Sequence, residues 1–179
     1  STSAGVTSTD EIWGSDEAAP YLRSVPCKFD EEEPWSSWIV ELPWKMLEDR
    51  IREKGEGTVL RSVTVTRRSE SGAATALEAV SDKGSCIIEN EYEIRKFLAP
   101  VNCMITEKDG TETAGGSLLP SAYFELERTQ NGNLQVRGKG YGHGVGMSQT
   151  GADKMAEQGY DYREILDYFF RNITVENLG

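Results

Sequence analysis

The most informative part of this chain is residues 138–146, in which glycine takes every second position: Gly138-Lys139-Gly140-Tyr141-Gly142-His143-Gly144-Val145-Gly146. We call this the glycine stretch. Glycine adopts positive φ angles without a steric penalty, so it lets a backbone turn sharply and approach a ligand closely. Five glycines also raise the conformational entropy that folding has to remove. The stretch is therefore either a tight structural corner or the wall of a binding site, and it carries the chain's only histidine, His143.

The sequence on both sides of the glycine stretch predicts regular structure. Upstream, residues 122–127 and 134–136 flank Asn131-Gly132, a pair typical of a β-hairpin turn. Downstream, Ser148 can cap a helix that ends at Gly159, and Asp161-Tyr162-Arg163-Glu164 has the form of a capping box for a second helix. Residues 173–175 are rich in β-branched side chains and predict a closing strand.

The first half of the chain predicts strands with two short helices. Residues 35–42 have the composition of a strand, and residues 43–55 predict a helix that begins at a proline and ends at a glycine. Residues 58–88 alternate between apolar and polar side chains and predict a three-stranded meander. A short capped helix is expected over residues 90–98. This order predicts an α+β fold with an antiparallel β-meander, a β-hairpin and short packed helices.

Composition excludes several classes of partner. The net charge is -11, whereas nucleic acids and anionic lipid surfaces attract clustered Lys and Arg, so we expect neither as a partner. No stretch approaches the ~20 apolar residues of a membrane span. One histidine and three cysteines without a C-x-x-C pair form no zinc-ligand set, so we expect no metal and no cofactor. The densest acidic run, residues 30–33, is interpreted as an exposed loop.

The three cysteines leave their redox state open. One disulfide with a free thiol is compatible with Cys27, Cys86 and Cys103, and burial of each thiol is the ordinary alternative.

Two enzymatic interpretations of the glycine stretch fail on spacing. The dinucleotide fingerprint Gly-x-Gly-x-x-Gly does not fit in any register, and no Gly-Lys-Ser/Thr follows for a P-loop. A Ser-His-Asp triad would need a Gly-x-Ser-x-Gly elbow, which the chain lacks. A structural corner and a ligand-binding wall both remain open from composition.

Nearly the whole chain resembles the SpoIID/LytB family of sporulation proteins and amidase enhancers. The family's carboxy-terminal signature is similar to Gly142-His143-Gly144-Val145-Gly146-Met147-Ser148-Gln149, followed by Gly151-Ala152. Its serine-rich segment resembles residues 1–7, although Ala4 replaces the first glycine of the family's pair. The family's continuation resembles Trp13-Gly14 and residues 20–25. The signature around His143 is highly specific, whereas the middle of the chain is weakly similar.

The resemblance implies a function in the cell wall. Sporulation protein D of this family is a lytic transglycosylase that acts on peptidoglycan glycan strands stripped of stem peptides. One glutamate protonates the glycosidic oxygen and then, as a base, helps the C6 hydroxyl of muramic acid close a 1,6-anhydro ring. The implied location is extracytoplasmic, in the wall or at a membrane through a segment outside this chain.

The resemblance also implies that the catalytic glutamate lies outside this chain, on a helix upstream of the serine-rich segment. The chain starts at Ser1 without a methionine, so we expect residues 1–179 to be one region, the C-terminal part of a larger SpoIID-like domain. It would act with an upstream fragment of the same protein or with other wall hydrolases. The implied substrate-binding residues are Ser3, Gly5, Thr7, His143, Ser148 and Gln149.

Three functions therefore compete. The chain is part of a lytic transglycosylase, a non-catalytic wall-binding or amidase-enhancing module, or an unrelated small enzyme that uses His143 and is active alone. Each candidate residue also has a structural alternative, because Ser and Thr hydroxyls in loops commonly bond to their own turns and Ser148 can serve only as a helix cap.

Overall fold

A computed structural model of the chain describes residues 1–13 and 19–176, so Gly14 of the Trp13-Gly14 pair lies outside the described residues. The strands are β1 (Trp38–Leu42), β2 (Leu60–Arg68), β3 (Ala74–Ser81), β4 (Gly84–Glu89), β5 (Met104–Glu107), β6 (Glu112–Ala114), β7 (Phe124–Arg128) and β8 (Leu134–Gly138). The helices are α1 (Trp44–Glu53), α2 (Glu91–Phe97), α3 (Gln149–Glu157) and α4 (Tyr162–Phe169), with short 3-10 turns η1 (Asp10–Trp13) and η2 (Pro34–Ser36).

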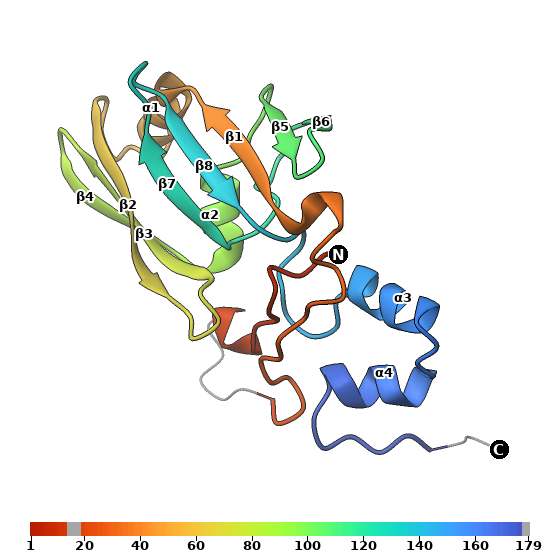
Figure 1. Cartoon of the computed structure of the whole chain (residues 1–179). Helices are drawn as coiled ribbons and strands as arrows, with labels where there is room; N and C mark the ends of the chain where they lie inside the picture. Colours follow the sequence, from red (N-terminus) through yellow and green to blue (C-terminus); the bar gives the residue numbers. More distant parts are fainter. Residues whose placement is uncertain (14–18, 177–179) are drawn as a thin grey trace.

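The strands form two antiparallel sheets (Figure 1). The predicted meander is the three-stranded sheet β2-β3-β4, and the predicted hairpin is the β7–β8 edge of a five-stranded sheet in the order β6-β5-β1-β8-β7. This arrangement confirms the α+β fold. The sequence reasoning missed β5 and β6, although Asp109-Gly110 between two short runs is a turn signal that could have predicted their hairpin.

One hydrophobic core joins the two sheets to α1 and α2. It includes Trp38 and Leu42 from β1, Leu77 from β3, Leu47 from α1 and Ile94 from α2, all at most 1% exposed. Strand β1 alternates strictly between buried and exposed residues, as expected for a strand with one face on the core. The shared core fixes the end of β8, where the glycine stretch begins.

Helices α3 and α4 lie on the far side of the amino-terminal residues from the sheets (Figure 1). Ser148 caps α3 by accepting from the Gly151 N–H at 3.1 Å, and the capping box of α4 forms between Asp161 and Glu164. Both predicted helix starts are confirmed. Phe169 and Met155 pack with Val25 and Cys27 in a separate small core.

The predicted closing strand is wrong. Residues 173–175 are irregular and follow α4, away from both sheets (Figure 1). A β-branched run becomes a strand only when a sheet edge lies within reach to accept its hydrogen bonds. Within the described chain, each helix is too short or too polar to serve as a membrane span.

Candidate functional site

The glycine stretch is packed tightly on one side and open on the other. A Cβ on Gly138 would come within 2.0 Å of the Trp38 ring, and one on Gly140 within 2.9 Å of the Ala4 nitrogen. Gly140 also has a φ of +75°, a conformation that disfavours other residues. Of the four side chains between the glycines, those of Lys139, Tyr141 and His143 are exposed and that of Val145 is buried. The glycines therefore let the backbone pack closely while three side chains face solvent.

The amino-terminal segment (residues 1–9) lies directly beside the glycine stretch. Thr2 and Tyr141 exchange main-chain hydrogen bonds of 3.0 and 2.8 Å, and the Ser8 N–H donates to the Gly144 carbonyl at 2.7 Å. Two segments more than a hundred residues apart in sequence are thus paired along their backbones. The structure brings together the two parts that the sequence analysis assigned to one site.

A buried carboxylate, Asp30, holds this junction. Its Oδ2 accepts from the Ser3 N–H at 2.7 Å and from the Ser148 hydroxyl at 2.6 Å, and its Oδ1 accepts from the Ser3 hydroxyl at 2.6 Å. Asp30 is 1% exposed, so the interpretation of residues 30–33 as an exposed loop is wrong at its first position. The carboxylate is buried because the hydrogen bonds that it accepts compensate for its lost hydration.

The hydroxyls of Ser3, Thr7 and Ser148 are engaged inside the protein. Ser3 and Ser148 donate to Asp30, and the Thr7 hydroxyl oxygen accepts from the Val25 N–H at 3.1 Å. These three residues still line one small pocket together with His143. Four of the six residues predicted for the site thus line this pocket. Sequence reasoning missed Asp30, whose position within an acidic run gave no signal of burial.

Gly5 and Gln149 lie at the edges of the junction. Gly5 has a φ of +85° and its carbonyl accepts from the Cys27 N–H at 2.9 Å. The Gln149 side chain is exposed, and its Oε1 accepts from the Ser1 nitrogen at 2.7 Å. Neither residue is among those that line the pocket beside His143.

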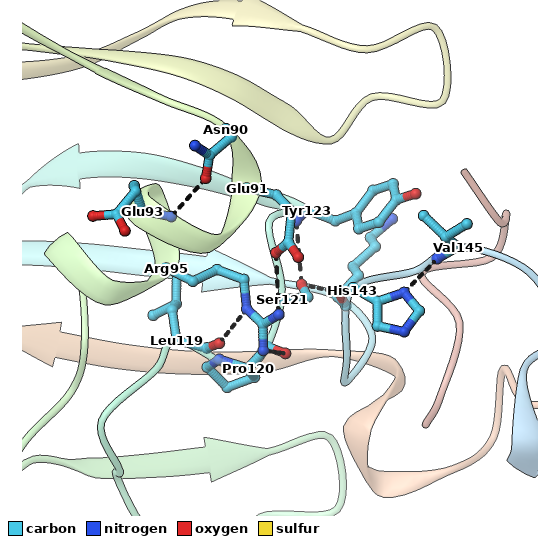
Figure 2. A network of polar contacts seen from close by, with 11 residues as sticks. Asn90, Glu91, Glu93, Arg95, Leu119, Pro120, Ser121, Tyr123, His143 and Val145 are labelled. Carbon is cyan, nitrogen blue, oxygen red and sulfur yellow. Dashed lines mark hydrogen bonds and ion pairs between the residues drawn. The ribbon is translucent and has the colours of Figure 1, made fainter. Parts of the chain in front are cut away.

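His143 presents one ring nitrogen outward. Its Nδ1 accepts from the Val145 N–H at 3.0 Å, which places the proton of the neutral ring on Nε2 (Figure 2). Partial burial lowers the pKa of the imidazole; the nearby Glu91 carboxylate opposes this shift and Arg95 adds to it. The ring is therefore neutral at pH 7, with an N–H donor at Nε2.

Trp13 completes the exposed surface at His143. The two rings meet edge to face with centroids 5.2 Å apart, and Trp13 is 49% exposed. Sequence reasoning named Trp13 in a motif but did not place it in the site. No periodicity could have done so, since the contact joins residues 130 positions apart.

A buried ion pair on α2 supports the glycine stretch from the side opposite to the amino-terminal segment. Glu91 and Arg95 on α2 form a 3.1 Å pair, and Arg95 also donates to the carbonyls of Leu119 and Pro120 at 2.8 and 3.3 Å (Figure 2). The Pro120 carbonyl in turn accepts from the Gly142 N–H at 2.9 Å. This chain of contacts fixes the backbone next to His143 from the side of α2.

The described residues carry little other reactive chemistry at the junction. Cys27 lies against Asp30, and burial raises the pKa of its thiol to about 11, so it stays protonated and inert at neutral pH. All three cysteines are free thiols. Within residues 1–13 and 19–176, no group of three or more His, Cys, Asp and Glu side chains is arranged to hold a metal ion. The arrangement is suited to binding and orienting a ligand.

Comparisons with known proteins show which family the chain belongs to. A family model described as a domain of unknown function, DUF8618, matches residues 27–146, two thirds of the chain. The chain belongs to this family. It is also related to the SpoIID/LytB proteins, which confirms the resemblance seen around His143.

Three relatives show the extent of that relationship. Stage II sporulation protein D of Bacillus amyloliquefaciens is 29% identical over 98% of this chain, and that of Bacillus subtilis (strain 168) is 27% identical over 98%. The amidase enhancer of Bacillus subtilis (strain 168) is 38% identical over 34% of the chain. The chain spans 43% of either sporulation protein and 8% of the amidase enhancer, so it corresponds to less than half of these relatives.

Proposed function

We propose that this chain is the glycan-binding part of an extracytoplasmic cell-wall protein that processes peptidoglycan strands during sporulation or wall remodelling. The observation that carries the proposal is the exposed pair of Trp13 and His143, in which a half-exposed aromatic ring lies beside an imidazole whose Nδ1 is held by a main-chain hydrogen bond. Sugar rings offer C–H faces that pack on aromatic rings and hydroxyls that accept hydrogen bonds. The names of the relatives, sporulation protein D and amidase enhancer, support a role in the wall.

In this proposal the reaction is a lytic transglycosylation. A carboxylic acid protonates the glycosidic oxygen and then takes the proton of the muramic acid C6 hydroxyl as the 1,6-anhydro ring closes. We expect that acid outside residues 1–179. His143 would donate from Nε2 to a sugar oxygen next to the scissile bond and would hold the strand in register.

The other residues of the junction take a supporting role in this proposal. Ser3, Thr7 and Ser148 would fix the backbone under His143 through their buried hydrogen bonds. Gln149, with its exposed amide, would contact the strand beside the pocket, and Gly5 would keep the amino-terminal segment close to it.

A second candidate is a non-catalytic wall-binding or amidase-enhancing module, which the name of one relative favours. Both candidates require glycan binding at Trp13 and His143. They differ in whether the protein that contains this chain releases 1,6-anhydro products.

The test is a sedimentation assay with insoluble glycan strands from which an amidase has removed the stem peptides. We expect His143→Ala and Trp13→Ala each to weaken binding about tenfold, the scale of one lost hydrogen bond or aromatic contact in a site. Tyr162→Ala on α4, which removes an aromatic ring that is 57% exposed, is the matched control and should bind normally. Equal binding by all three folded variants would overturn the proposal.

Product analysis separates the two candidates. The longer protein is incubated with the same strands, and 1,6-anhydromuramic ends are counted by mass spectrometry. Release that depends on His143 supports the transglycosylase, whereas binding without release supports the non-catalytic module.

A further inference from the structure

Lys139 is the first exposed side chain of the glycine stretch, four residues before His143. Within the described residues its Nζ makes no ion pair and no hydrogen bond to another group, unlike most charged side chains near it. It borders a cavity of about 290 Å³ at the end of the β7–β8 hairpin, together with Arg68 and Arg137.

The charges around this cavity do not balance. Three cations line it but only one carboxylate, Glu125, although the chain as a whole has a net charge of -11. Glu125 is already bonded to Arg68 at 3.1 Å, and Arg137 lies 3.4 Å from Glu127 on the neighbouring strand. The two arginines thus have carboxylate partners, and the charge of Lys139 is left over.

Arg68 is held rigidly at the cavity wall. Its guanidinium donates to the carbonyls of Gly72 and Phe124 at 3.0 and 2.8 Å, while its side chain stays 30% exposed. A guanidinium fixed in this way loses little entropy when it meets an anion. An anion between Arg68 and Lys139 would therefore meet one fixed and one mobile donor.

The cavity adjoins the His143 site through Tyr123. The Tyr123 ring lines the cavity, and it also packs against Gly144, where an added Cβ would lie 2.8 Å from the ring. Four residues of extended chain span at most about 14 Å, so a saccharide of a few units can reach from His143 to Lys139.

We infer that the cavity formed by Lys139, Arg68 and Arg137 is a carboxylate-binding subsite for an acidic sugar unit of the strand that His143 contacts. This inference rests on the proposed function. A muramic acid unit carries a lactyl carboxylate, which is free and charged only where no stem peptide is attached to it. A cationic subsite selects the free carboxylate over the neutral amide, because a charged acceptor bonds more strongly to Lys and Arg.

The experiment compares two tetrasaccharides that differ in this group. One alternates N-acetylglucosamine with N-acetylmuramic acid bearing free carboxylates, and the other is chitotetraose, which has none. Calorimetric titration of the whole chain should give about tenfold tighter binding of the acidic tetrasaccharide at low salt. Lys139→Gln should abolish this preference and Lys139→Arg should retain it, while Lys45→Gln on α1 serves as the control and should change nothing.

Each outcome has one meaning. A preference for the acidic sugar that Lys139→Gln removes supports the subsite. Binding of both sugars that depends on His143 but shows no preference, or a preference that survives in Lys139→Gln, overturns the subsite and leaves the proposed function intact. If neither sugar binds, the proposed function fails and the subsite fails with it.

Discussion

The amino-terminal segment and the glycine stretch run side by side, yet they use their side chains in opposite ways. Ser3, Thr7 and Ser8 are at most 4% exposed, and their hydroxyls bond to groups inside the protein. In the glycine stretch, Lys139, Tyr141 and His143 are exposed, and the glycines between them pack inward. One segment supports the junction, and the other presents side chains to a ligand.

This difference teaches how to interpret a hydroxyl-rich motif. A serine that is close to a site need not contact the ligand, since a buried hydroxyl must have an internal partner. Of these two segments, the side chains that can reach a ligand are the three exposed ones that alternate with glycine. Three changes test the contrast, from the largest expected effect on stability to the smallest.

Asp30→Ala should have the largest effect. It removes the close acceptor of three buried donors, namely the Ser3 N–H and the hydroxyls of Ser3 and Ser148, and leaves the two hydroxyls only the longer bonds of 3.4 and 3.3 Å to main-chain carbonyls. We therefore expect a loss of about 3 kcal/mol in the free energy of unfolding. Urea denaturation at pH 7 measures it. Glu32→Ala, in the same acidic run but with a side chain 92% exposed, should cost less than about 0.5 kcal/mol. Equal midpoints for the two variants would show that the buried hydroxyls do not support the junction.

Gly140→Ala should have the next largest effect. The new Cβ would meet the backbone of residues 2–4 at 2.9 Å and the residue would keep a φ of +75°, so we expect a loss of about 2 kcal/mol. Gly110→Ala has a similar φ of +86° but no atom within 4 Å of the new Cβ, so it isolates the backbone strain at about 1 kcal/mol. The difference in thermal midpoint between the variants reports the close packing of the glycine stretch. If Gly140→Ala were as mild as its control, that packing would not matter.

Lowering the pH should have the smallest effect on stability, and it acts on His143, one of the exposed residues of the glycine stretch. Because the pKa of His143 is lowered in the folded chain, the unfolded chain takes up this proton more readily. The stability that the neutral ring contributes is present above pH 6.5, the ordinary pKa of histidine, and is lost as the pH falls through and below that value. NMR titration of the only histidine should give a pKa below 6.5, and glycan binding should weaken as Nδ1 is protonated and its bond from Val145 breaks. A pKa above 6.5 would contradict the partial burial to which the shift is assigned.

Local signals predicted most of the fold. The meander, the β7–β8 hairpin and the caps at Ser148 and Asp161 were predicted from turn residues and alternation, because these elements form between neighbours in sequence. Strands β5 and β6 were missed because their runs are short; β5 is held by pairing with the distant strand β1, and β6 pairs with β5. The predicted strand at residues 173–175 failed for the opposite reason: its composition was suitable, but it pairs with no strand among the residues that the structure describes.

The sequence by itself determined the glycine spacing, the identity of the side chains between the glycines and the helix that follows them. Each of these depends on the intrinsic freedom of a residue or on bonds to residues a few positions away. Only the tertiary structure decided that Asp30 is buried under Ser3 and Ser148, that Trp13 meets His143, and that Lys139 shares a cavity with Arg68. Whether a carboxylate is buried or an aromatic ring finds a partner depends on which distant segments the core brings together, and no local pattern encodes that.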